Sequence, residues 1–200
     1  QNYPILLTSK RFWGYCLASA FGSGAFFVYL GGAPAVGAEV YALDPQSVGL
    51  FLGAPAFGYF FGNFIAGRYS KSIGIDFMVL YGLALALVGM SLSFTISALG
   101  YGSALSFFGF MTFVGLGNGM SIPNATAGML AIKPELAGTA SGLGSAMMIG
   151  GGAALSALAG PVLHVGSGDL ALIALMWLSV FFGILLILLV IKRNQTLTAD

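Results

Sequence analysis

Long apolar stretches without a charged residue dominate the chain. Five of them cover residues 12–38, 45–67, 77–132, 136–168 and 170–191. A helix needs about 20 largely apolar residues to cross the hydrocarbon core of a membrane. The third stretch is long enough for two such helices, and Gly100 and Gly102 interrupt it near its middle. The pattern therefore predicts six membrane-spanning helices, at residues 12–34, 48–67, 77–97, 103–131, 136–163 and 170–191.

The same pattern excludes two other architectures. A helix of a soluble protein carries a polar face toward water, whereas these segments are apolar all round. The strands of a membrane β-barrel alternate strictly between apolar and polar residues, and residues 170–191 show no such alternation. We therefore expect an all-α membrane protein that forms a single bundle over residues 1–200.

Composition and charge narrow the possible functions. Hydrophobic residues make up 58% of the chain and charged residues 6%, against about 25% charged residues in soluble domains. A net charge of +1 excludes electrostatic binding of nucleic acid as the main function. The single cysteine, Cys16, cannot form an intrachain disulfide. Because the chain starts with Gln1 rather than Met, we expect it to be a fragment of a longer protein.

The charged residues sort onto two sides of the predicted bundle. One set of loops and ends carries all seven basic residues, and the opposite loops carry none of them. Under the positive-inside rule the basic side is cytoplasmic, so both termini are expected there. The basic residues are Lys10, Arg11, Arg68, Lys71, Lys133, Lys192 and Arg193, and the opposite loops carry Glu39, Asp44, His164 and Asp169.

Neutral polar residues inside the spans are the candidates for a binding site, because no ionisable residue lies at mid-membrane depth. In the fourth span Asn118, Ser121 and Asn124 occupy an arc of about 120° beside the helix-breaking Pro123. Such an arc favours the lining of a cavity. The alternative is that the amides hydrogen-bond between helices and hold the bundle together.

Three further spans contribute candidates of the same kind. The first span carries Ser19, Phe26 and Tyr29 on one helical face, where rings supply contact area and hydroxyls fix the orientation of a ligand. The fifth span carries Met148, an adaptable apolar side chain, within a stripe of small residues. In the second span Phe57, Phe60 and Phe64 face either the cavity or lipid. Packing between helices is the alternative for the candidates of the first and fifth spans.

Catalysis finds no support in the sequence. Gly138–Gly142 superficially resembles the Gly-x-Ser-Gly motif of rhomboid proteases, but that nucleophile needs a histidine base. His164 is 23 residues beyond Ser141 on the same predicted helix, which places it roughly 35 Å away. No spacing of ligands predicts a metal site, and no Gly-rich loop predicts a nucleotide. We therefore expect neither an enzyme nor a cofactor.

Several motifs resemble the C-terminal six-helix half of a major facilitator superfamily transporter, most closely the Bcr/CflA drug-resistance exporters. The residues that carry this resemblance are 7–11, 31–34, 62–74, 123–127 and 134–142. Residues 62–74 resemble the second copy of the cytoplasmic loop signature of the superfamily, with Gly62, Arg68, Lys71 and Gly74 in matching positions. Gly67 stands where an acid usually precedes the arginine.

The resemblance implies a second six-helix half with the substrate site between the halves, and proton-coupled export from the bacterial inner membrane. The first, second, fourth and fifth spans would then line the cavity, and the third and sixth would face lipid. The expected partners are a small-molecule substrate, membrane lipid, and the missing N-terminal half or a second copy. The alternative is a six-helix channel subunit or scaffold that works as a homo-oligomer.

Overall fold

The computed structural model describes residues 6–164 and 168–199, with no side-chain description at 164 and 197–199, and within these ranges short turns connect helices. Six of its helices or helix pairs are long and apolar enough to cross a membrane, which confirms the predicted all-α membrane fold. We number these spans from first to sixth in chain order. The elements are α2 (Lys10–Ala35), η1 (Val36–Val40), α3 (Pro45–Leu52), α4 (Ala54–Ile73), α5 (Ile75–Ile96), η2 (Ser97–Tyr101), α6 (Ala104–Leu130), η3 (Pro134–Leu136), α7 (Ala137–Ala157), α8 (Ala159–His164) and α9 (Gly168–Ala199).

The second span is two helices rather than the single helix predicted at 48–67. Helix α3 ends at Leu52, and α4 begins at Ala54 after a turn at Gly53. Pro55 has no N–H and cannot donate to the carbonyl of Phe51 one turn earlier. That carbonyl instead accepts a hydrogen bond of 3.3 Å from the Tyr29 hydroxyl of α2. The break therefore has a local cause in Pro55 and a partner in a neighbouring helix.

The cytoplasmic loop predicted between the second and third spans is much shorter than expected. Helix α4 continues to Ile73, so Arg68 and Lys71 lie in its last two turns rather than in a loop. The chain then reverses at Gly74, whose φ of +91° is a backbone conformation that favours glycine. The fifth span is also divided, with a break at Leu158 between α7 and α8 ahead of Pro161.

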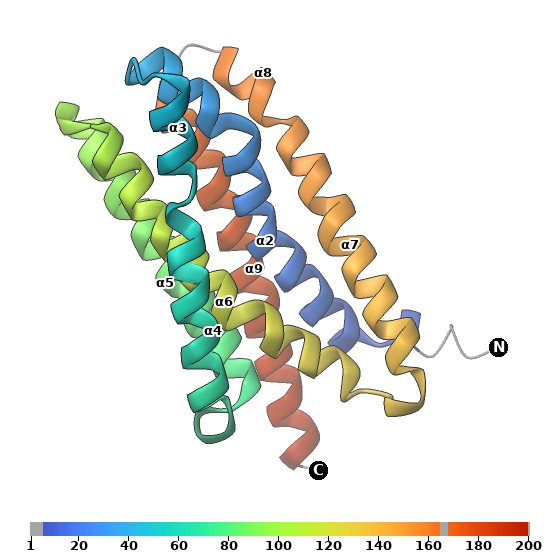
Figure 1. Cartoon of the computed structure of the whole chain (residues 1–200). Coiled ribbons are helices and arrows are strands. Elements are labelled where there is room, and N and C mark those ends of the chain that lie inside the picture. The colour runs from blue at the N-terminus through green and yellow to red at the C-terminus, as the bar shows by residue number, and fades with distance from the viewer. Residues whose placement is uncertain (1–5, 165–167, 200) are drawn as a thin grey trace.

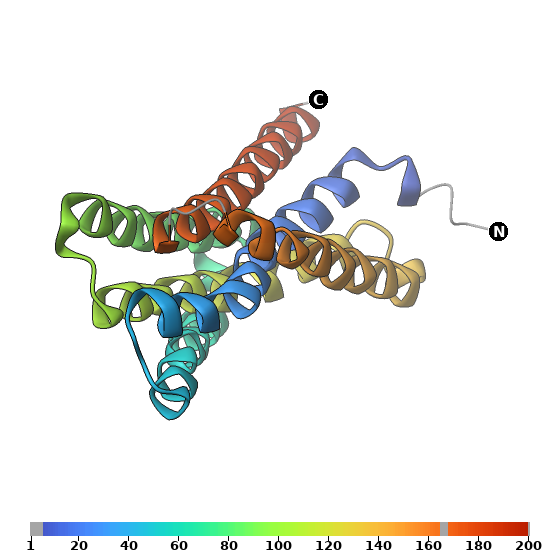
Figure 2. The ribbon, with the colours of Figure 1, turned by 90° about the horizontal axis from the view of Figure 1, so that it is seen from above.

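Two three-helix groups make up the bundle (Figures 1 and 2). Helix α2 packs against α7 and α9, and α6 packs against α4 and α5, while the groups meet where α2 contacts α6 and α5 contacts α9. If the first span is exchanged with the fourth, the second with the fifth and the third with the sixth, the same pairs of spans are in contact. That is the arrangement of two three-helix repeats, and it places α2 and α6 at the centre.

Glycines bring α4 and α6 into backbone contact. A Cβ atom built on Gly58 would lie 1.9 Å from the Thr112 carbonyl oxygen, and one on Gly62 would lie 2.2 Å from that of Leu116. On the facing helix, a Cβ on Gly115 would lie 1.8 Å from the Pro55 oxygen, and one on Gly119 would lie 2.5 Å from the Tyr59 oxygen. Both helices thus use glycines four residues apart, the spacing that lets membrane helices approach closely.

Two aspartates tie the third span to the sixth at opposite ends of the bundle. Asp76, in the first turn of α5, accepts hydrogen bonds from the Tyr15 hydroxyl and from the Asn194 amide at 2.7 Å. Asp169, in the first turn of α9, accepts from the Ser97 hydroxyl and from the Tyr41 hydroxyl at 2.7 Å. Burial and the hydrogen bond to Asp169 raise the pKa of Tyr41. Both carboxylates are therefore structural partners rather than free loop charges.

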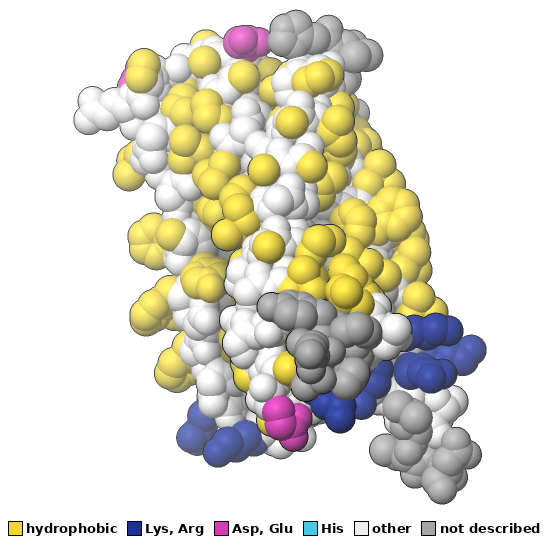
Figure 3. Space-filling view, turned by 90° about the vertical axis from the view of Figure 1, so that its right-hand side faces the viewer, with side chains coloured by type: hydrophobic (Ala, Val, Ile, Leu, Met, Phe, Trp, Pro, Cys, Tyr) yellow, Lys and Arg dark blue, Asp and Glu magenta, His cyan; other side chains and the backbone are white. Residues whose placement is uncertain are grey.

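The surface carries an apolar band between two polar ends. In the face shown in Figure 3, hydrophobic side chains cover the middle of the molecule, and Lys and Arg side chains gather only at the lower end. The beginning of α2 and the end of α9 lie toward the same lower end in Figure 1, whereas α3 and α8 lie at the upper end. The one-sided charge predicted from the sequence therefore has a counterpart in the fold.

Candidate functional site

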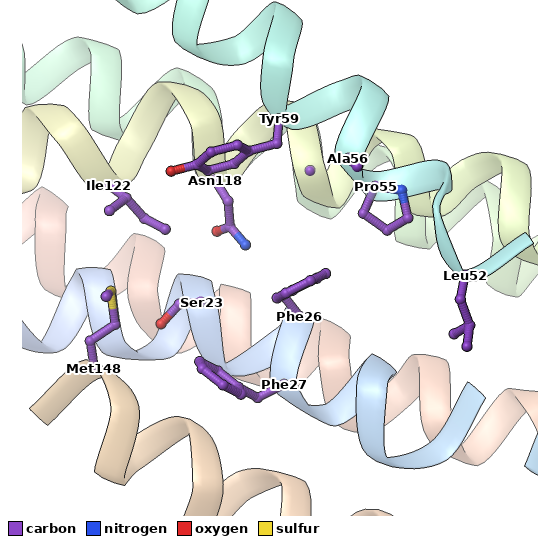
Figure 4. A pocket seen from close by; sticks show the side chains of 11 residues that line it. Ser23, Phe26, Phe27, Leu52, Pro55, Ala56, Tyr59, Asn118, Ile122 and Met148 are labelled. Atoms are coloured by element: carbon purple, nitrogen blue, oxygen red, sulfur yellow. The ribbon is translucent and has the colours of Figure 1, made fainter. Parts of the chain in front are cut away.

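A cavity of about 370 Å³ lies between four of the six spans (Figure 4). Helices α2, α4, α6 and α7, together with the end of α3, supply its walls. These helices belong to the first, second, fourth and fifth spans, the four that the resemblance assigns to the cavity. Its lining residues are Ser23, Phe26, Phe27, Leu52, Pro55, Ala56, Tyr59, Gly115, Asn118, Ile122 and Met148.

Asn118 is the main directed polar group of this cavity. Its side chain is 5% exposed and points into the space between α2 and α4 in Figure 4. Its amide forms no hydrogen bond with other residues of the part of the chain that the structure describes. Buried amides normally form hydrogen bonds. The donor and acceptor of the Asn118 amide are therefore available to a ligand or to water.

Two hydroxyl groups accompany the amide. Ser23 donates to the Ala20 carbonyl at 3.2 Å, which uses its proton but leaves its oxygen able to accept. Tyr59 is partly exposed and brings a phenolic hydroxyl from α4. The other lining residues are apolar or glycine, and none of the lining side chains is charged. The wall therefore offers rings and methyl groups with a few neutral hydrogen-bonding groups.

The large cavity is lined by three of the predicted residues, Phe26, Asn118 and Met148. Ser19 lies beside the large cavity rather than in its lining. Its hydroxyl is 3.7 Å from the Met148 sulfur, and the two residues line a small adjoining space. Thr126, Ser141 and Ser145 line the same small space. Met148 thus separates the large cavity from a hydroxyl-rich gap between α6 and α7.

The other three predicted residues are buried between helices and do not line the large cavity. Tyr29 is fully buried, donates to the Phe51 carbonyl and packs near Phe107 and Phe108. The Asn124 amide donates to the Met120 carbonyl of its own helix at 2.8 Å. Ser121 is buried, and its hydroxyl has no hydrogen-bond partner among the described residues. For Tyr29 the packing alternative has a direct contact between helices, whereas the Asn124 hydrogen bond lies within α6.

The sequence analysis expected the second span at the cavity but did not identify the residues of that span that line it. Pro55, Ala56 and Tyr59 face the cavity, whereas Phe57 and Phe60 are about 70% exposed away from it. The spacing of Gly58 and Gly62 in the sequence could have indicated which residues of this span line the cavity. These glycines fix the face of α4 that packs on α6, and the cavity-lining residues flank that face.

The residues of the loop signature are spread over the end of α4. Gly62 is buried against α6, where it serves helix packing. Arg68 and Lys71 are exposed in the last two turns of the helix, and Gly74 forms the turn into α5. His164 ends α8, but its side chain lies outside the described residues.

Comparison with known proteins decides the family. The model of the Major Facilitator Superfamily matches residues 2–157, more than three quarters of the chain. The chain belongs to the Major Facilitator Superfamily. A relative within it, a bicyclomycin resistance protein homolog of Haemophilus influenzae, is 28% identical over 159 residues. Together these matches confirm the resemblance to superfamily transporters of the Bcr/CflA type.

The extent of the match matters for the site. The aligned residues cover 79% of this chain but only 39% of the relative. No solved structure matches the chain. As a Major Facilitator Superfamily chain with six apolar spans, the protein is an integral membrane transporter or part of one.

Proposed function

We propose that this chain forms one six-helix half of an exporter of amphiphilic, moderately apolar small molecules. The observation that carries the proposal is the uncharged cavity whose buried Asn118 amide has no partner in the described chain. Ring-lined pockets with a few fixed polar groups bind such molecules, because the rings provide area and the polar groups set orientation. The name of the bicyclomycin resistance relative is consistent with this class of substrate.

The absence of fixed charge in the lining residues argues against several other substrates. A sugar phosphate, a carboxylate or an inorganic ion needs a counter-charge or a dense set of hydrogen bonds when it leaves water. The lining residues supply an amide and two hydroxyls and no charge. Any charge on the substrate, and the acid that couples export to protons, is therefore assigned to residues outside this chain. We place both ends of the chain in the cytoplasm and the protein in the bacterial inner membrane.

The second half of the transporter is expected to cover α4 and α7. The second and fifth spans are the least buried of the six, with 22% and 11% of their most apolar windows inside the bundle. They flank the cavity on either side of α2 and α6. Large exposed side chains on α4, such as Phe57 and Phe64, would be covered by that half or by a second copy.

The proposal is tested by efflux measurements on the full-length protein. Asn118→Ala, Phe26→Ala and Met148→Ala should each change proton-driven efflux of several unrelated lipophilic compounds, and by different factors for different compounds. Removing one hydrogen bond of about 1 kcal/mol corresponds to roughly fivefold for a compound that uses Asn118. Val88→Ala is the matched control, because Val88 is exposed on α5 away from the cavity.

The outcome of this test is a pattern rather than a single rate. Compound-dependent changes in the three cavity variants, with no change in the Val88 variant, support a polyspecific wall. Equal efflux of every compound by the wild type and by folded, inserted cavity variants would mean that these residues only pack.

A further inference from the structure

Another hollow lies at the basic end of the bundle, where α2 begins. It has a volume of about 510 Å³ and runs between the beginning of α2 and the last turns of the membrane-spanning part of α9. We call it the basic groove. Its lining residues are Leu7, Thr8, Lys10, Arg11, Trp13, Gly14, Leu17, Leu186, Leu189, Val190 and Arg193.

The basic groove has two chemically distinct parts. Its walls are aliphatic, with Leu17 from α2 facing Leu186 and Val190 from α9. Its polar part carries Lys10 and Arg11 from one helix and Arg193 from the other. No acidic side chain of the residues that the structure describes lines the groove. Three positive charges therefore lie next to a hydrocarbon surface without an acid among the lining residues.

The basic side chains of the groove form no ion pair with the described part of the chain. None of Lys10, Arg11 and Arg193 forms an ion pair there, and the buried Nε of Arg11 has no hydrogen-bond acceptor. The nearby carboxylate of Asp76 accepts hydrogen bonds from Tyr15 and Asn194 and does not line the groove. A buried arginine N–H without an acceptor indicates a site that an external oxygen completes.

We propose that the basic groove binds an anionic phospholipid. The phosphate would accept hydrogen bonds from Arg11 and Arg193, with Lys10 as a further charge, and an acyl chain would lie along the leucine walls. Arginine matches phosphate oxygens with paired donors, and basic pockets between membrane helices are suited to anionic lipid headgroups. The aliphatic walls favour a lipid over a free phosphate ion, because a soluble anion makes no use of them.

Trp13 provides a direct measurement, since it lines the groove and its indole fluoresces. The chain contains two tryptophans, and Trp177 lies between α5 and α9 in a different hollow. In full-length protein whose only tryptophan is Trp13, with Trp177→Phe included, quenching by brominated lipid reports occupancy of the groove. Brominated phosphatidylglycerol and brominated phosphatidylcholine are compared in bilayers of otherwise equal composition.

The proposal predicts stronger quenching by phosphatidylglycerol than by phosphatidylcholine. Arg11→Gln and Arg193→Gln should each reduce the relative affinity for phosphatidylglycerol by roughly fivefold, the effect of one basic residue on an anionic lipid. Lys133→Gln is the matched control, because Lys133 precedes α7 at the same end of the bundle but does not line the groove. It should leave the preference unchanged.

Two results would overturn the proposal. Equal quenching by the two lipids in the wild-type groove would show no selectivity for an anion. An equal loss of preference in Lys133→Gln and Arg11→Gln would show that diffuse surface charge, rather than the groove, attracts the lipid. Quenching by phosphatidylcholine serves as the check that each variant keeps its fold. A variant that keeps this quenching and loses only the phosphatidylglycerol preference supports the groove.

Discussion

Replacing Gly62 with alanine should force α4 and α6 apart. The added Cβ would lie 2.2 Å from the Leu116 carbonyl oxygen, whereas ordinary contact begins at 3.4 Å, so the helices must separate by about 1.2 Å. The atom that this Cβ would meet belongs to the backbone, which cannot rotate away as a flexible side chain could. Overpacking of this kind typically costs about 1–3 kcal/mol.

Gly67 is the matched control on the same helix. A Cβ built there has no neighbouring atom within 4 Å, so Gly67→Ala adds the same methyl group without a clash. Alanine is the better helix former by about 1 kcal/mol in water, so this variant should be neutral or slightly more stable. The pair separates the effect of close approach from the effect of helix propensity.

The assay is the free energy of unfolding of the full-length protein in mixed micelles titrated with sodium dodecyl sulfate. Gly62→Ala should shift the midpoint to lower detergent fraction, and Gly67→Ala should not. On the facing helix, Gly115→Ala with Gly109→Ala as its control should repeat the result, because a Cβ on Gly115 meets the Pro55 oxygen at 1.8 Å and one on Gly109 meets nothing within 4 Å. Equal midpoints for Gly62→Ala and Gly67→Ala would refute the backbone contact between α4 and α6.

Three further predictions concern other parts of the bundle. Tyr29→Phe should lower the free energy of unfolding by about 1 kcal/mol in the same micelle titration, because the Phe51 carbonyl loses its hydroxyl donor; an unchanged value would contradict that role. The N–H and hydroxyl of Ser47 hold the pKa of Asp44 below its usual range, so this carboxylate stabilises the start of α3 above the usual aspartate pKa and stops doing so as the pH falls through the lowered value. The protection factors of α3, which are its hydrogen-exchange rates relative to the intrinsic rates at each pH, should therefore fall on acidification in the wild type but not in Asp44→Asn, and wild-type protection factors that do not change with pH would count against the cap. Single cysteines at Glu39 and Lys71 should react with an impermeant reagent from opposite sides of the membrane, and labelling from one side would contradict the topology.

The number of spans and the helical fold could be predicted because they depend on the length of apolar stretches, which is a local property. The break at Gly53 could not be predicted in the same way. The break follows from Pro55, which leaves the Phe51 carbonyl without its helical donor. The fold tolerates the break because Tyr29, 22 positions before Phe51, supplies a hydrogen-bond donor to that carbonyl. Asp169 was predicted as a loop charge for the same reason, because its partner Tyr41 lies far away in the sequence.

The candidate site was only partly predictable because a helical wheel gives direction but not neighbours. Asn118 and Asn124 fall within one polar arc, yet Asn118 reaches the cavity while Asn124 turns back to the Met120 carbonyl. The two residues differ because of the place where α2 crosses α6. The periodicity of a single helix gives no information about that crossing. Phe26 was found from the aromatic and hydroxyl face of its helix and Met148 from its adaptable side chain, whereas the α4 wall depends on glycine packing against α6.

Substrate protection of a cysteine at position 56 is the most direct test of the proposed cavity. Ala56 lines it from α4, and Gln46 at the start of α3 is an exposed control outside it. Full-length protein with Ala56→Cys or Gln46→Cys as its sole cysteine, with Cys16→Ala included, is labelled with a small thiol reagent in the presence and absence of an exported lipophilic compound. We predict that the compound slows labelling at position 56 and leaves labelling at position 46 unchanged. Unchanged labelling at position 56, at compound concentrations that saturate efflux, would contradict the assignment of the cavity as the substrate site.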